Sequence, residues 1–86
     1  MNQLEKIFKA LANRRRLAIV RYLKNNEEAT VTAIACEIRL SLRAASRHLV
    51  KLAACDILER EQRNLQAYYR LARTQSSEIK RIVSVI

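Results

Sequence analysis

The side chains with the most evident chemistry lie between Ser41 and Ala54, where arginine, lysine, serine and histidine alternate with small apolar residues. At 3.6 residues per turn, Ala45, Leu49 and Leu52 fall on one face of a helix. The polar residues fall largely on the other faces: Arg43, Ser46, Arg47 and Lys51, with His48 at the margin. Long cationic and short hydroxyl side chains contact base edges and phosphates from a helix in the DNA major groove. The stretch therefore predicts a recognition helix.

We expect this helix to divide its contacts between bases and phosphates. The expected base contacts are Arg43, Ala44, Arg47 and His48. The expected phosphate contacts are Ser41, Ser46 and Lys51. Arginine pairs most naturally with guanine, and a serine before the first turn can also cap the helix by accepting an unpaired N–H.

The charge balance indicates a polyanionic partner. The 86 residues carry a net charge of +9, with a pI of about 10.4, so nucleic acid is the first candidate and an anionic membrane surface the second. A charge that serves solubility alone is the alternative. No apolar run approaches the ~18 residues of a membrane span, and the first twenty residues lack the apolar core of a signal peptide. We therefore expect no membrane partner and a cytoplasmic, nucleoid-associated protein.

Helical spacing predicts the elements that hold the recognition helix. Residues 2–12 carry one apolar stripe, and a second helix runs from a cap at Asn13 to about residue 24. A third helix begins after a cap at Thr32, and residues 39–41 form a tight turn into the recognition helix. Two short helices, a three-residue turn and a basic second helix predict a helix-turn-helix.

Three consecutive arginines open the second helix. Cations at a helix N-terminus oppose the macrodipole, whereas phosphate is attracted to the same place. We expect Arg14 and Arg15 to contact phosphate and Arg16 to be a structural ion-pair partner.

After Asp56 the apolar period changes from 3.6 to 2, which predicts a β-hairpin. Strands are expected at residues 57–61 and 67–71, with a polar tip at 62–66 and a very short third strand at 30–31. A hairpin after a helix-turn-helix is a wing, whose tip can reach the DNA backbone or the minor groove. The expected wing contacts are Arg63, Asn64 and Gln66. Tyr68 and Tyr69 are expected to pack within the hairpin rather than to stack on bases.

Both ends of the chain, residues 2–12 and 74–86, carry apolar stripes at helical spacing. The stripe residues are Leu4, Ile7, Phe8 and Leu11 at one end, and Ile79, Ile82, Val83 and Ile86 at the other. A domain of this size has little core left to cover two such helices, whereas packing across a two-fold axis would bury them. We therefore expect a homodimer. The alternative is that both helices fold back onto the chain's own core.

The remaining signals concern thiols and turns. Cys36 and Cys55 each follow an alanine, and we expect reduced, buried structural thiols, with a redox role as the alternative. The chain contains no glycine and no proline. Its turns must therefore be made by residues that adopt positive φ less easily, of which asparagine and aspartate are the best suited.

Taken together, these segments resemble the ArsR-type family of winged-helix repressors. Residues 7–17, IFKALANRRRL, resemble the family's opening motif F-K-A-L-[SA]-[DN]-P-T-R-L, and residues 40–52 resemble its recognition-helix motif L-S-x-x-x-[VA]-S-x-H-L-x-x-L. Residues 57–60 and 68–71 resemble the wing strands, so the likeness covers about residues 4–72. The resemblance implies a symmetric dimer built from the first and last helices, with two recognition helices in successive major grooves.

The chain departs from the family at turns and at metal sites. Arg39 and Asp56 stand where the family often has glycine. Metal-sensing members carry a Cys-x-Cys pair where Thr30 and Thr32 fall here, or place Asp, His and Glu ligands on the last helix, which here offers Glu78 alone. A transition metal needs about four soft or borderline donors. We therefore expect no metal site and no transition-metal inducer.

These observations predict one domain over residues 1–86, mainly α with a small β-hairpin. The expected architecture is a winged helix-turn-helix of about five helices and a two- or three-stranded wing. The predicted function is sequence-specific binding of a pseudo-palindromic operator in double-stranded DNA by a dimeric transcriptional repressor. The alternative is a winged-helix module that binds an acidic protein partner. The sequence has no paired-carboxylate cleft, glycine-rich phosphate loop or Cys-His motif at a recognised spacing, so we expect no enzyme activity and no cofactor.

Overall fold

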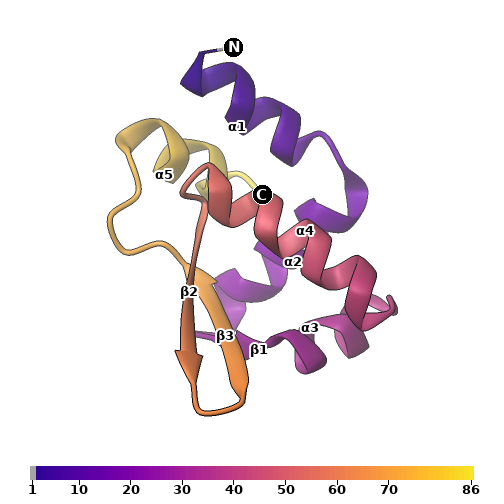
Figure 1. The fold of residues 1–86 in the computed structure, drawn as a ribbon. Coiled ribbons are helices and arrows are strands. Elements are labelled where there is room, and N and C mark those ends of the chain that lie inside the picture. Colours follow the sequence, from indigo (N-terminus) through magenta and orange to yellow (C-terminus); the bar gives the residue numbers. More distant parts are fainter. Residues whose placement is uncertain (1) are drawn as a thin grey trace.

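The computed structural model describes residues 2–86, which form five helices and a small three-stranded antiparallel sheet (Figure 1). The elements are α1 (Gln3–Leu11), α2 (Arg14–Asn25), β1 (Ala29–Thr30), α3 (Val31–Ile38), α4 (Leu42–Ala54), β2 (Leu58–Arg63), β3 (Gln66–Leu71) and α5 (Ser77–Ser84). In Figure 1, α1 and α5 lie at the end of the molecule opposite the hairpin tip, and α4 crosses the middle. The predicted winged helix-turn-helix architecture is confirmed. Within the described part of the chain, no helix has the length and apolar character needed to cross a membrane.

Asparagine side chains begin the first two helices. Asn2 Oδ1 accepts the Glu5 N–H at 2.8 Å, and the Glu5 carboxylate accepts the Asn2 N–H in return, which makes a capping box. Asn13 Oδ1 accepts the N–H groups of Arg15 and Arg16 at 2.9 and 3.1 Å. These bonds pair donors that a helix start otherwise leaves free, and they confirm the predicted cap at Asn13.

The start of α3 lies two residues earlier than predicted. Thr30 is the cap, not Thr32: its hydroxyl oxygen accepts the Ala33 N–H at 3.1 Å. Thr30 can do this because β1 ends there in extended backbone, with φ −75° and ψ 160°. The short strand is correspondingly Ala29–Thr30, where Ala29 pairs with Tyr69 of β3, rather than residues 30–31.

Three turns place a residue other than glycine in the left-handed region. They are Arg39 (φ 58°), Asp56 (φ 61°) and Asn64 (φ 55°), which end α3, follow α4 and form the hairpin tip. This conformation costs a residue with a Cβ atom roughly 1–2 kcal/mol, and asparagine and aspartate tolerate it better than other residues do. Arg39 is therefore the least suited of the three. The Leu40 N–H donates to the Ala35 carbonyl oxygen at 3.0 Å and closes the end of α3.

The sheet has the strand order β1-β3-β2. Its register pairs Leu58 with Leu71 and Arg63 with Gln66, which leaves Asn64 and Leu65 as a two-residue tip. The predicted tip at residues 62–66 is therefore too long. A two-residue turn is possible because Asn64 adopts positive φ, as tight hairpins require.

The tyrosines of β3 belong to the hairpin, as predicted. Tyr69 is buried in the core, and its partners across the sheet are Ala29 and Arg60. Tyr68 is half-buried, and the Arg63 guanidinium lies 4.3 Å from the centre of its ring.

The core fixes α4 through Ala45, Leu49 and Leu52, which are fully buried. Leu49 and Leu52 pack in one hydrophobic cluster with Ile7 of α1 and Ile79 of α5. Both ends of the chain therefore support the helix that carries the cations.

More of the apolar stripe residues of α1 and α5 are buried in this core than the sequence suggests. The buried half comprises Ile7, Leu11, Ile79 and Val83. The prediction that these four form a surface between two copies is wrong, because they fill the chain's own core. Ile82 and Ile86 pack partly against that core, whereas Leu4 and Phe8 remain 46% and 54% exposed.

The two cysteines differ in their surroundings. Cys36 is exposed on α3, so its predicted burial is wrong, whereas Cys55 is buried as predicted. The Cys55 thiol donates toward the carbonyl oxygens of Lys51 and Leu52 at 3.6 Å, and burial raises the pKa of this thiol.

An ion-pair network joins the hairpin to the segment before β1. Both oxygens of Glu28 accept from the Arg63 guanidinium, with Nη2···Oε1 at 2.8 Å. Glu61 Oε1 accepts from Arg63 at 3.0 Å and from Arg70 at 2.9 Å. Hydrogen bonds from Arg63, and then from Arg70, lower the pKa of Glu61 to about 2.

Replacing Arg39 by glycine should raise the free energy of unfolding by about 1 kcal/mol, because glycine adopts the left-handed conformation without a Cβ clash. Urea unfolding followed by circular dichroism measures the change. Arg39→Ala is the matched control: it removes the same charge but keeps Cβ, so it should gain nothing comparable. Equal stabilisation by both variants would contradict a backbone origin.

A carboxyl titration followed by NMR should place the pKa of Glu61 near 2, and Arg63→Gln should raise it toward the usual carboxyl range. A depressed pKa stabilises the folded state above the ordinary carboxyl pKa, and this contribution is lost as pH falls toward 2. Wild type should therefore lose more stability than Glu61→Gln between pH 5 and 2. Arg60→Gln is the control, since Arg60 donates to Gln62 and not to the network. An unchanged Glu61 pKa in Arg63→Gln would exclude the assigned cause.

Candidate nucleic-acid interface

The outward face of α4 carries cations, and the helix contains no carboxylate. Arg43, Arg47 and Lys51 are exposed. At about 100° per residue, Arg43 and Arg47 lie roughly 40° apart around the helix axis, and Lys51 lies roughly 40° further on. The opposite stripe is buried, so these three side chains point outward as the sequence predicts.

The remaining predicted residues of α4 lie along the edges of this face. Ala44, Ser46 and His48 are half-buried. Ser41, at the start of the helix, is the cap: its Oγ accepts the Ala44 N–H at 3.1 Å. Its hydroxyl proton stays available to a phosphate oxygen, because the cap uses the oxygen only as an acceptor.

His48 is held by Arg16 of α2. Arg16 Nη1 lies 3.3 Å from His48 Nδ1, and its Nε donates to the Ala10 carbonyl oxygen. A guanidinium can only donate, so Nδ1 accepts and the proton lies on Nε2. Burial, and then the charge of Arg16, lower the pKa of His48, which favours a neutral ring. Arg16 is thus structural, as predicted, but its partners are a carbonyl and an imidazole rather than an acid.

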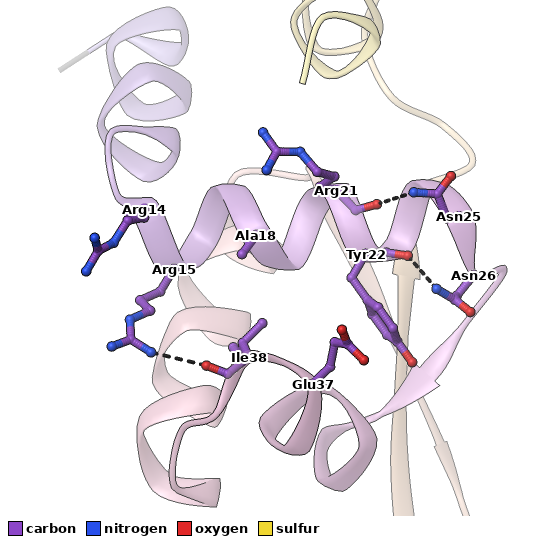
Figure 2. A pocket seen from close by; sticks show the side chains of 9 residues that line it. All are labelled: Arg14, Arg15, Ala18, Arg21, Tyr22, Asn25, Asn26, Glu37 and Ile38. Atoms are coloured by element: carbon purple, nitrogen blue, oxygen red, sulfur yellow. Dashed lines mark hydrogen bonds between the residues drawn. The ribbon is translucent and has the colours of Figure 1, made fainter.

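The two arginines that precede Arg16 point in different directions. Figure 2 shows Arg15 turned toward the end of α3, where its Nη1 donates to the Ile38 carbonyl oxygen at 3.1 Å. Arg14 is exposed and points away from α3 (Figure 2). Both line a hollow of about 450 Å³ between α2 and α3. Arg15 therefore holds the two helices together, and Arg14 is the freer cation.

A second hollow, of about 630 Å³, lies between α1 and α4. Its charged lining residues are Lys6, Lys9, Arg16 and Lys51. These cations extend the positive surface from α4 toward α1, and none of the lining residues is acidic.

The wing differs most from the sequence prediction. Arg63 is paired with Glu28 and Glu61 and is part-buried, so its guanidinium is held by carboxylates of the chain itself. Asn64 and Gln66 are exposed at the tip. Between them, Leu65 is 98% exposed, although it is not among the predicted wing contacts.

Two further exposed residues of α4, both apolar, are not among the contacts predicted from the sequence. Leu42 opens the helix, and Val50 lies near its middle, 59% exposed. The signal for Val50 was available in the sequence, because the spacing of residues 43, 47 and 50 places them on one face of a helix. In residues 2–86, no three His, Cys, Asp or Glu side chains gather as a metal site would require.

Comparisons with known proteins agree on one family. A family model described as a helix-turn-helix domain matches residues 11–61, which run from the end of α1 into β2. The HTH-type transcriptional regulator Rv0324 of Mycobacterium tuberculosis is 34% identical over all 86 residues, and the chain spans 38% of the length of that relative.

Solved structures share the whole fold. A homodimeric winged helix-turn-helix DNA-binding domain from Mycobacterium bovis, a possible ArsR-family transcriptional regulator, is 32% identical with a TM-score of 0.82, over 96% of this chain and 73% of that one. NolR from Sinorhizobium fredii is 31% identical with a TM-score of 0.80, over 96% of this chain and 79% of that one. The chain belongs to the ArsR-type winged helix-turn-helix family.

Proposed function

We propose that the protein is a sequence-specific, double-stranded-DNA-binding transcriptional regulator that acts as a dimeric repressor. The observation that carries this proposal is the outward face of α4, where Arg43, Arg47 and Lys51 are exposed on a helix without a carboxylate. A rigid cationic helix of this kind fits the major groove. The names of the relatives, a transcriptional regulator and a DNA-binding domain, support the same function.

Each part of this surface has a proposed role. Arg43, Ala44, Arg47 and His48 face base edges, and His48 acts as a neutral Nε2–H donor. Ser41, Ser46 and Lys51 contact phosphates, and Arg14 adds a phosphate contact at the start of α2. Arg15 makes a weaker contribution, since one of its N–H groups is bonded to the Ile38 carbonyl oxygen. On the wing, Asn64 and Gln66 contact DNA, and Arg63 does so only where phosphate displaces a carboxylate.

The proposed dimer forms through the exposed part of the terminal helices. Leu4 and Phe8 supply most of the free apolar surface of α1. Ile82 of α5 and Ile86, which follows this helix, add half-buried apolar side chains. A two-fold axis through this surface makes the operator pseudo-palindromic, with two half-sites about one helical turn apart. Residues 1–86 then act as one DNA-binding unit in the cytoplasm, on the nucleoid, without catalytic activity.

Arg47→Ala should lower affinity for an operator selected from a random duplex pool by ~1–3 kcal/mol and relax the preference at one base pair of each half-site. The reason is the loss of a bidentate contact to guanine. Lys51→Ala is the matched control: it should weaken all sequences alike and lower the salt slope by about one for each subunit. Fluorescence anisotropy at several salt concentrations measures both, and an unchanged base preference in Arg47→Ala would contradict the role of this residue.

The same titration separates DNA binding from the alternative function. Wild type should bind random duplex DNA with an affinity that falls steeply as salt rises, because bound cations are released. A module that binds an acidic protein need not show this dependence.

Phe8→Glu should convert the dimer into a monomer at micromolar concentration, because it buries a charge in the apolar contact. The fold should survive, since Phe8 is half exposed within one copy. Sedimentation velocity measures the change. Leu65→Glu, at the exposed wing tip, should remain dimeric. A monomeric wild type, or a dimeric Phe8→Glu, would overturn the proposed contact.

A further inference from the structure

Val50 is an apolar side chain at the edge of the cationic face of α4, on the side of Arg43. At about 100° per residue, it lies roughly 20° from Arg43 and roughly 60° from Arg47 around the helix axis. It is 59% exposed and is absent from the residues that pack against the core. Val50 therefore shares its direction with the two arginines rather than with Leu49 beside it.

Nothing within the described chain accounts for a valine at this position. A β-branched residue restricts χ1 against the preceding turn and is a weaker helix former than alanine. Exposure also leaves its methyl groups in water. The residues one turn away, Ser46, Arg47, Ala53 and Ala54, include no large apolar side chain that could cover it. The position makes physical sense once an apolar group of a partner covers it.

Duplex DNA presents one such group in the major groove, the 5-methyl of thymine. The rise of 1.5 Å per residue places Val50 about 4.5 Å along the helix from Arg47, which is close to one base-pair step of roughly 3.4 Å. With α4 lying along the major groove, a side chain at that distance would face the base pair next to the one that Arg47 contacts.

We infer that Val50 recognises the 5-methyl group of a thymine in each half-site, next to the guanine contacted by Arg47. This inference rests on the proposed function and specifies part of the DNA sequence that the protein selects. The contact is apolar and short-ranged, so it adds base preference without adding to the salt dependence. Val50 is then a specificity-determining residue, and Arg47 and Val50 together select a guanine and a thymine in adjacent base pairs.

The test removes the methyl group from the DNA rather than from the protein. A duplex is selected from a random pool with the wild-type protein, and each thymine of one half-site is then replaced in turn by deoxyuridine. This replacement keeps the hydrogen-bonding groups of the base and deletes the 5-methyl alone. At one thymine position of that half-site, the replacement should weaken binding by roughly fourfold, which is the effect of uncovering one buried methyl group.

The matching protein variant completes a double-mutant cycle. Val50→Ala should bind the thymine duplex roughly sixteenfold more weakly than wild type, because it removes the contact from both half-sites, and it should not distinguish deoxyuridine from thymine at that position. It should fold, because Val50 is exposed and alanine is the better helix former, and circular dichroism checks this. Leu65→Ala loses an exposed apolar side chain outside α4 and should keep the full sensitivity to the methyl group.

Two outcomes overturn the inference while the proposed function stands. The first is binding of the selected duplex that no deoxyuridine substitution weakens. The second is an equal loss in wild type and in Val50→Ala, which would place the methyl contact on another residue. Failure of the wild-type protein to bind any duplex in the pool would instead overturn the proposed function and this inference together.

Discussion

The rotation of α4 about its own axis is the constraint on which the rest of the structure depends. Ala45, Leu49 and Leu52 are fully buried, and turning the helix by one residue, about 100°, would bring either Ala44, His48 and Lys51 or Ser46, Val50 and Ala53 to the core. The first set would bury the Lys51 ammonium group without a partner, and the second would replace both leucines by smaller side chains and leave a cavity. The hydrophobic core therefore determines which side of α4 is cationic, and the turn at Arg39 and the chain reversal at Asp56 determine where that side points.

The arginines divide into those that hold the fold and those that face outward, and composition alone does not reveal the division. Arg15 and Arg16 donate to carbonyl oxygens on other elements. Arg63 is paired with Glu28 before β1, and Arg63 and Arg70 are both paired with Glu61 of the wing. A guanidinium group is well suited to join elements of the fold, because its several N–H donors bind planar acceptors in a fixed geometry. Two of the eight acids, Glu59 and Glu61, lie on the wing strands, whereas α2 and α4 contain no carboxylate and carry eight of the seventeen lysines and arginines.

Periodicity predicted the helices, the hairpin and the buried stripe of α4 because each depends on local spacing. The errors arose where a distant partner decides the outcome. Thr30 rather than Thr32 caps α3 because β1 pairs with β3, and Arg63 joins Glu28 because the sheet brings residues 35 apart into contact. Cys36 follows the buried Ala35 but lies on the exposed side of a short helix. The spacing of an amphipathic stripe likewise does not reveal which of its residues the same chain buries. Ile7 and Ile79 therefore fit the predicted dimer contact by their spacing, although they lie in the core.

The same terminal helices connect the proposed dimer to the DNA-binding face. Ile7 and Ile79 pack in one cluster with Leu49 of α4, while Phe8, one residue beyond Ile7, is half exposed on the outer side of α1. A packed interior transmits displacement because it has few voids to absorb it. A change in the way that two copies meet at Phe8 would therefore move Ile7 against α4 and alter the spacing of the two recognition helices.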